Sequence, residues 1–562
     1  MPAAAAALWL HPRRPDPAGR ASGSIPSPSS NLIPRMADSR RILWADDEID
    51  LLRPHILFLE AKGFDVTSVT NGADAVEQMR GERFDVVFLD EQMPGMGGLE
   101  TLGELKDVAP ETPVVMITKS EEEGVMEEAI GGQIADYLIK PVNPKQILLT
   151  CKRLLEGNRL REEKASQNYL QSFGQLSMEI NSGLGWEGWI DVYSELVRYG
   201  LEIDADDAAR QIFDDQYRDA NREFGRYIED VYPTWIEQAK DGDTDDRPPL
   251  SHEVMPKWVL PHLDGGNGSK PSRPVLFFLI DCMRFDQWLE FERLLYPLFD
   301  VEKDWHYSLL PTATPYSRNA IFGGLLPIDL AARYPQFWQH DNGDEHSLNQ
   351  HEADFLGELL KRKHRRDTRF RYEKITNADD GSAMADSITD LTQHDLAAVV
   401  VNFVDILAHS RSDSNVLKEI APDERAYRAL TRTWFEHSWL LRAFEELARQ
   451  DVTIVITTDH GVIRSLHATK VIGDRETSTS LRYKHGRNLK CDERNAIFVK
   501  EPETYGLPRT GLNENYIFAK EDYYFVYPTN YHRYLNHYKD TFQHGGASLE
   551  EMLLPVVTLR PR

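Results

Sequence analysis

Three hydroxyl side chains stand close together in the stretch LLPTATPYSRNAIFGGLLP, residues 309–327, at Thr312, Thr314 and Ser317. A buried core strand has no need of such crowding, so one of these oxygens is a candidate nucleophile. A hydroxyl is a weak nucleophile at neutral pH unless a base or a metal ion lowers its pKa. The stretch therefore calls for an activating group elsewhere in the chain, and it leaves the choice of oxygen open.

Metal-binding side chains recur where apolar segments end. Asp405 and His409 are four residues apart, a spacing that places two ligands on one face of a helix. Asp459 and His460 are adjacent, at the end of an apolar run. We predict one zinc ion held by Asp405, His409 and His544, and a second held by Asp281, Asp459 and His460. Mixed His and Asp donors favour zinc over magnesium, with manganese left open.

A pair of such ions suits chemistry at phosphorus, because together they stabilise the attacking oxygen and a non-bridging oxygen. The chain has a formal net charge of −27, yet basic residues outnumber acidic ones between residues 464 and 490. We interpret this reversal as a pocket for an anionic substrate, with a solvated loop as the alternative. The predicted substrate-binding residues are Arg464, Lys470, Arg482 and Lys484, and the predicted phosphate contacts are Arg318 and Asn319.

A second set of polar residues lies near the N-terminus, again at the ends of apolar segments. Three carboxylates at strand ends can hold one Mg²⁺, and a lysine ammonium can help neutralise a phosphoryl group placed on one of them. We predict Mg²⁺ ligands at Asp46, Asp47 and Asp90, with Asp90 as the phosphoacceptor. Thr118 is expected to hydrogen-bond the phosphate, Lys140 to supply the counter-charge, and Tyr137 to rotate inward behind them.

Residues 38–157 resemble the receiver domain of bacterial two-component response regulators. The motifs that carry the resemblance are the acidic pair at Asp46 and Asp47, FLDEQMPGMGG around Asp90, MIT ending at Thr118, and YLIKP around Lys140. The resemblance implies phosphorylation of Asp90 by a sensor histidine kinase.

The segments that position these residues alternate between strand and helix patterns. Residues 41–46, 85–90 and 113–118 predict buried strands of a doubly wound α/β domain, and residues 274–281, 396–405 and 451–461 predict a second α/β region. Working residues sit at the carboxyl ends of such strands. Amphipathic helices with aromatic stripes predict a helical bundle and linker at 158–270. We predict a disordered tail at 1–37 and a C-terminal domain at 271–562.

The order Asp, Thr, Asp-x-x-x-His, Asp-His, His resembles the alkaline phosphatase superfamily. The ending FQHGGASLEEMLLPVV is typical of its PglZ-type domain, and TPYSRNAIFGG resembles a nucleophile turn with Thr314 as the nucleophile and Thr312 as the alternative. Receiver, helical bundle and PglZ domain in this order resemble the PorX-type response regulators associated with type IX secretion. That resemblance implies zinc-dependent hydrolysis of phosphodiesters, including cyclic or short oligonucleotides, and a homodimer formed on phosphorylation. The alternative is a signalling adaptor that binds a sigma factor or a secretion component.

The bulk composition excludes several classes of protein. No apolar run approaches the ~18 residues of a membrane-spanning helix, and the acidic charge opposes binding to duplex DNA. The three cysteines are far apart and odd in number, so a disulfide framework or a cysteine-based zinc site is not expected, and we predict a reducing, cytoplasmic location.

Overall fold

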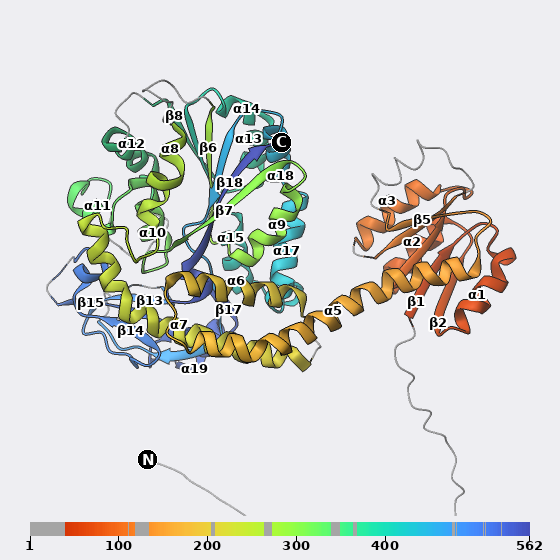
Figure 1. Ribbon diagram of the computed structural model, residues 1–562, viewed down its shortest axis with the longest axis horizontal. Helices are drawn as coiled ribbons and strands as arrows, with labels where there is room; N and C mark the ends of the chain where they lie inside the picture. The colour runs from red at the N-terminus through yellow and green to blue at the C-terminus, as the bar shows by residue number, and fades with distance from the viewer. Residues whose placement is uncertain are drawn as a thin grey trace, which may run out of the picture. The chain divides into compact units, whose positions relative to one another are not determined.

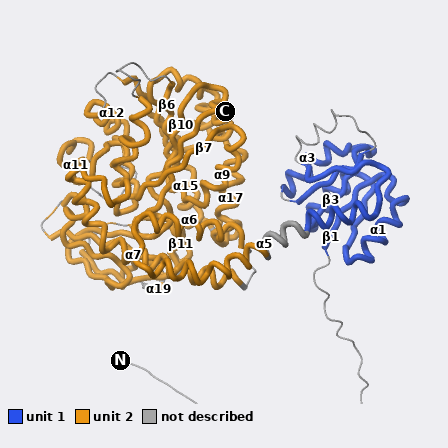
Figure 2. Tube along the Cα trace, viewed as in Figure 1, with its two compact units in different colours: residues 1–160 blue, residues 161–562 orange. Residues whose placement is uncertain are grey.

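The computed structural model describes residues 40–562 apart from residues 111, 119–133, 204–207, 264–272, 339–348, 364–367, 475–477, 479, 510, 512 and 530. The predicted tail, residues 1–37, and the predicted boundary at residue 270 lie outside the described residues. The chain divides into two compact units, residues 1–160 and 161–562, shown in Figure 2. Among the described helices, none has the length and apolar character needed to cross a membrane.

Unit 1 contains a five-stranded parallel sheet in the order β2-β1-β3-β4-β5. Alternate residues of β1 face opposite sides, so Ile42 packs in one core cluster and Leu43 in another. The first cluster includes residues of α1 and α5 and the second includes residues of α2 and α3, so helices cover both faces of the sheet (Figure 1). The elements are β1 Arg40–Ala45, η1 Ile49–Leu52, α1 Arg53–Glu60, β2 Phe64–Val69, α2 Gly72–Gly81, β3 Val86–Asp90, α3 Gly98–Val108, β4 Val114–Thr118, β5 Asp136–Ile139 and α5 Pro144–Ile180.

Unit 2 is built on a six-stranded sheet in the order β7-β18-β10-β6-β9-β8. Strands β10, β6, β9 and β8 are parallel, and β18 is antiparallel to both of its neighbours. Every residue of β6, β9 and β10 is buried, as expected for parallel strands covered on both faces. The strands are β6 Val275–Ile280, β7 Phe299–Tyr307, β8 Phe370–Ile375, β9 Leu396–Val401, β10 Thr453–Thr457 and β18 Leu553–Pro561. The predicted α/β fold is confirmed in both units.

Helices cover both faces of this sheet (Figure 1). Phe277 of β6 packs on Phe322 of α10 with ring centroids 5.9 Å apart, and Phe278 packs on Phe444 of α18 at 5.0 Å. Successive side chains of one strand thus anchor helices on opposite faces. The helices of this region are α9 Phe285–Leu295, α10 Thr314–Gly323, α11 Pro327–Arg333, α12 Glu352–Lys363, α13 Ala378–Asp386, α14 Ile388–Leu391, α15 Phe403–Asp413, α16 Asn415–Ile420, α17 Glu424–Glu436 and α18 Trp439–Leu447.

The aromatic stripes of the predicted helical segment lie in the core of unit 2. Trp189 of α6 packs on Phe224 of α7 with centroids 5.3 Å apart, and Trp235 of α7 packs on Tyr307 of β7, also at 5.3 Å. These rings belong to the same hydrophobic cluster as the central sheet, so the helices share a core with the sheet instead of forming a bundle with a core of their own. The elements are α6 Trp186–Glu202, α7 Ala208–Asp241, η2 Ser251–Glu253, η3 Met255–Val259 and α8 Leu260–Leu263.

Short strands after β10 form three small sheets, which pair β11 with β17, β12 with β16, and β15 with both β13 and β14. The first pairing brings residues near 463 and 543 together, although they are far apart in the sequence. The elements are β11 Ile463–Ser465, β12 His467–Lys470, β13 Tyr483–Arg487, β14 Ala496–Val499, η6 Pro502–Tyr505, β15 Glu514–Ala519, β16 Tyr523–Val526, α19 Tyr531–Tyr538, β17 Thr541–Gln543 and α20 Leu549–Met552.

Candidate functional site

The structure separates the three candidate hydroxyls. Thr314 is the first residue of α10, and its Oγ1 lies 3.0 Å from His460 Nε2. Thr312 Oγ1 donates to the carbonyl of Gly546 at 2.8 Å, and Ser317 Oγ donates to the carbonyl of Ala313 at 2.9 Å. Both of these side chains are fully buried and tie backbone segments together. The Thr314 hydroxyl thus lies against a predicted metal ligand, whereas Thr312 meets one, His544 Nδ1, through its carbonyl oxygen at 3.3 Å.

Both predicted zinc-binding groups come together in unit 2. In each group of three, the ligand atoms lie within 4.8 Å of one another. The groups are Asp405, His409 and His544, and Asp281, Asp459 and His460. Asp281 follows β6, Asp459 and His460 follow β10 closely, and Asp405 lies in the first turn of the helix after β9. Adjacent parallel strands therefore deliver their ligands to the same edge of the sheet.

Two buried carboxylate oxygens in this site lack a hydrogen-bond partner. Arg318 Nε donates to Asp459 Oδ2 at 2.9 Å, and its Nη2 forms an ion pair with Asp281 Oδ2. The other oxygen of each carboxylate, Oδ1, has no hydrogen-bond partner among the residues that the structure describes, although both aspartates are at most 1% exposed. A buried anionic oxygen without a partner is costly, so this arrangement fits a site for a metal cation.

In the group formed by Asp281, Asp459 and His460, burial shifts the pKa values of the side chains. Burial, reinforced by the nearby Asp459 and Asp405 carboxylates, raises the pKa of Asp281 to about 7. Burial lowers the pKa of His460, so its imidazole is neutral and able to bind a metal. His460 Nδ1 lies 3.2 Å from the carbonyl of Gly461, which directs the Nε2 lone pair toward Thr314 when Nδ1 carries the proton.

The structure does not support a direct phosphate contact by Arg318 or Asn319. Arg318 is 1% exposed and is surrounded by Asp281, Asp459 and Glu352, the last at 3.5 Å. The Asn319 amide donates to the carbonyl of Pro315 within α10 at 2.9 Å. Arg318 instead holds the two aspartates in place, because its guanidinium binds one oxygen of each and leaves the other facing away.

The sequence prediction missed Cys282, which lies between the two groups. Its ligand atom is within 4.8 Å of those of Asp281 and Asp405, and also of those of His460 and His544. The thiol donates to Asp405 Oδ1 at 3.2 Å. Its position directly after Asp281, the residue predicted to end a strand and bind metal, is the signal that could have identified it.

An ion pair between Arg482 and Glu551 supports the loop that carries His544. Gly546 N donates to Glu551 Oε1 at 2.9 Å, and Arg482 pairs with Glu551 Oε2 at 2.5 Å. An added Cβ at Gly546 would lie 2.3 Å from the carbonyl oxygen of Ala519, so this close approach requires glycine. Arg482 is therefore a support for the loop that bears a predicted metal ligand.

The prediction that Arg482 contacts substrate is wrong, because its side chain is fully buried and already paired with Glu551. Lys484 is corrected for the same reason, because it is 2% exposed and donates to the carbonyl of Ser478 at 2.7 Å. Positive charge in the sequence did not reveal that these side chains point into the protein. Lys470 lies exposed on β12.

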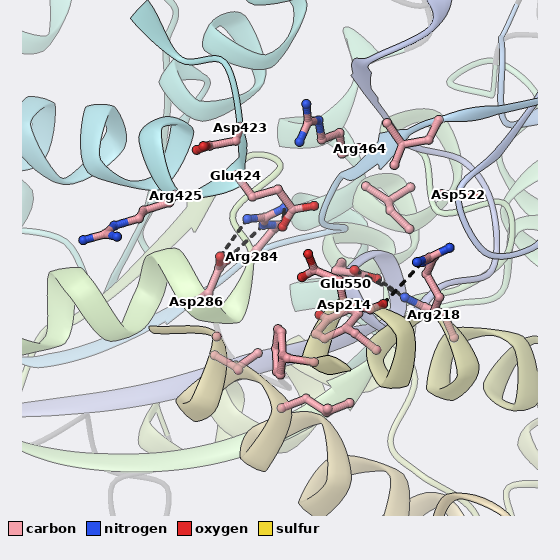
Figure 3. A pocket seen from close by; sticks show the side chains of 18 of the residues that line it. Asp214, Arg218, Arg284, Asp286, Asp423, Glu424, Arg425, Arg464, Asp522 and Glu550 are labelled. Atoms are coloured by element: carbon pink, nitrogen blue, oxygen red, sulfur yellow. Dashed lines mark hydrogen bonds and ion pairs between the residues drawn. The ribbon is translucent and has the colours of Figure 1, made fainter. Parts of the chain in front are cut away.

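Arg464 lines a separate cavity of about 560 Å³ between helices α6 and α7 and the C-terminal domain (Figure 3). It bonds Asp540 Oδ1 at 2.5 Å, outside both metal-ligand groups. Burial and the nearby Glu424 raise the pKa of Glu550, another wall residue, to about 7. Asn221 of α7 donates to Glu550 Oε2 at 3.1 Å. The hydrogen bond from Asn221 therefore links α7 to Glu550, the residue that precedes Glu551.

The receiver site brings its predicted residues together in unit 1. Asp46, Asp47 and Asp90 have ligand atoms within 4.8 Å of one another. Lys140 Nζ lies 2.9 Å from Asp90 Oδ2 and also 2.9 Å from Asp46 Oδ2. Burial raises the pKa of Asp90.

The two remaining receiver residues differ in exposure. Thr118 is buried at the end of β4 and donates to Glu91. Tyr137 is 38% exposed, so its ring is not in the inward position predicted for the phosphorylated state.

Three family profiles match the chain. The BREX system PglZ alkaline phosphatase-like domain matches residues 254–559, the response regulator receiver domain matches residues 42–152, and the PorX response regulator linker domain matches residues 159–236. Fold and site together define a response regulator with an alkaline phosphatase-like domain. The PglZ match covers more than half of the chain, which therefore belongs to the PglZ family. Its three matched domains give it the PorX-type architecture.

Individual relatives are similar over shorter lengths. The transcriptional regulatory protein ZraR of Klebsiella oxytoca is 33% identical over 135 residues, which are 24% of this chain and 30% of that protein. A CpxR homologue of Haemophilus influenzae is 30% identical over 146 residues, 26% of this chain and 63% of the relative. The chain thus spans less than two thirds of either relative. The chemotaxis protein CheY4 of Vibrio cholerae has 28% identity and covers 21% of this chain and 100% of its own, with a TM-score of 0.20.

Proposed function

We propose that this response regulator hydrolyses phosphodiesters through Thr314 at a two-zinc centre in its PglZ domain, with cyclic or short linear oligonucleotides as the substrate class. The proposal rests on one arrangement, in which Asp281 Oδ1 and Asp459 Oδ1 have no hydrogen-bond partner among the described residues and the Thr314 hydroxyl lies 3.0 Å from His460 of the same ligand group. A binding platform without catalysis has no need of a hydroxyl placed 3.0 Å from a buried imidazole.

The residues that would hold the ions are the two groups described above, with three donors each. Bound zinc would supply positive charge that lowers the pKa of the threonine hydroxyl and stabilises negative charge on phosphate oxygens. The chain itself orients the nucleophile, because Thr314 is fixed at the start of α10 and its hydroxyl is directed to His460 Nε2. Arg318 orients the Asp281 and Asp459 carboxylates and opposes the rise in their pKa values that burial causes.

In unit 1, we propose that Mg²⁺ binds at Asp46, Asp47 and Asp90, and that a sensor histidine kinase phosphorylates Asp90. Phosphorylation would favour a homodimer and thereby regulate the hydrolase, in the context of type IX secretion. Contact with a sigma factor or secretion component is a separate, compatible role. The clustering of the three carboxylates around Lys140 supports the phosphoacceptor assignment.

The test of catalysis is hydrolysis of bis(p-nitrophenyl) phosphate by the zinc-loaded full chain. We expect Thr314→Val, which keeps the shape and removes the hydroxyl, to lower kcat by roughly 10³-fold or more, because a covalent route is lost. Thr314→Ser restores a hydroxyl and should retain measurable turnover. A Thr314→Val variant as active as the parent, with equal zinc content, would rule out this nucleophile.

A further inference from the structure

The thiol of Cys282 is buried at the junction of the two metal-ligand groups. It is 0% exposed, and its sulfur lies 3.2 Å from Asp405 Oδ1, an oxygen that is itself 3.3 Å from His409 Nε2. The sulfur is also grouped within 4.8 Å with the ligand atoms of His460 and His544. The Cys282 thiol therefore lies close to ligand atoms of both metal-ligand groups.

The backbone conformation at Cys282 is strained for a residue that has a side chain. Cys282 has φ +66°, in the left-handed region that costs free energy for a residue other than glycine. Glycine would adopt this conformation without that cost. Replacing Cys282 with glycine would therefore relieve backbone strain at this position.

An independent observation indicates that a cation belongs at this junction. Asp281 Oδ1 is buried and has no hydrogen-bond partner in the described part of the chain, and Asp281 offers a ligand atom that is grouped with those of Cys282 and Asp405. A cation held there would face oxygen, nitrogen and sulfur donors together. Sulfur is a donor that zinc accepts readily and that magnesium and manganese accept poorly.

We propose that the Cys282 sulfur is a further ligand of the metal ion held by Asp405, His409 and His544, and that it selects zinc over manganese at this position. The proposal rests on the proposed two-metal centre. When the metal binds, a metal–sulfur bond forms and the thiol proton passes to solvent, with no change of oxidation state. A fourth protein donor would hold this ion more firmly than three donors, and because zinc can take a fifth ligand, the ion would still be able to bind a phosphate oxygen.

The test is zinc K-edge X-ray absorption on the zinc-loaded full chain. We expect a sulfur neighbour at about 2.3 Å from zinc in the parent protein. The neighbour should vanish in Cys282→Gly, which suits the left-handed backbone, and in Cys282→Ala, which keeps a Cβ. Cys491→Ser is the matched control and should retain the signal, because Cys491 belongs to none of the metal-ligand groups found among the described residues.

The outcomes separate this proposal from the proposed function. A parent that binds two zinc ions with nitrogen and oxygen neighbours alone overturns the sulfur ligand and leaves the hydrolase intact. A parent that binds no zinc overturns both. Because the decisive spectrum is that of the parent, a variant that fails to fold does not affect the result. Competition between zinc and manganese adds a second measurement, in which Cys282→Gly should lose at least about tenfold of the preference for zinc.

Discussion

Replacing Arg318 with methionine should destabilise the metal-free protein far more than the zinc-loaded one. Arg318 is 1% exposed and pairs with Asp281, Asp459 and Glu352. Removing one partner of a buried ion pair costs about 3–5 kcal/mol, because a buried charge is left without compensation. Methionine keeps most of the length of the side chain, so the loss should reflect charge more than packing.

Zinc should offset part of this loss. The two aspartates that Arg318 neutralises are also the proposed zinc ligands, so a bound cation replaces some of the missing positive charge. We expect the decrease in the free energy of unfolding to be smaller with saturating zinc by more than about 1 kcal/mol. Urea unfolding followed by tryptophan fluorescence, with and without zinc, measures both values.

A control arginine makes the comparison specific. Arg362 donates to the carbonyl of Gly323 at 2.6 Å and belongs to none of the metal-ligand groups found in the described part of the chain. Arg362→Met should therefore lose the same stability in both conditions. An equal or larger loss for Arg318→Met in the presence of zinc would refute the assignment of these carboxylates as metal ligands.

Three further predictions concern Glu550, Asp90 and Gly546. Burial raises the pKa of Glu550 from 4.5 to about 7, so the native state holds a proton that the unfolded state releases, and stability should fall as pH rises across that interval, by at most about 3 kcal/mol. Glu550→Gln should flatten this slope in urea unfolding measured from pH 4 to 8; an unchanged slope would contradict it. Asp90→Asn should abolish labelling of the full chain by radioactive acetyl phosphate in Mg²⁺, whereas persistent labelling would move the acceptor elsewhere. Gly546→Ala should displace the His544 loop and reduce zinc content toward one ion per chain, measured by mass spectrometry, and a retained pair would show that the loop adapts.

The sequence was sufficient to predict the strands and the clustering of the candidate metal-binding side chains, because both follow short-range rules. An apolar run that stops at an acid, as at Asp281 and Asp459, signals a buried parallel strand whose end faces a site. The spacing of Asp405 and His409 is a local helical relation. Since parallel strands align their carboxyl ends, ligands distant in the chain could be grouped without knowledge of side-chain positions.

The roles of the arginines could not be predicted in this way. Arg482 is paired with Glu551, which lies 69 residues later, and both are fully buried. Composition shows that a segment is basic but does not show which charges face solvent. Arg318 likewise occupies the centre of three carboxylates from separate elements. Cys282 was discounted because the chain's cysteines are scattered, although one cysteine suffices when the other donors are Asp and His.

We infer that six side chains dispersed along the chain hold two zinc ions beside Thr314. Anomalous diffraction collected above and below the zinc edge from crystals of the zinc-loaded chain tests it most directly. We expect two zinc peaks per chain, one among Asp405, His409 and His544 and one among Asp281, Asp459 and His460. Peaks located elsewhere, or no peak at these positions in crystals grown with excess zinc, would contradict it.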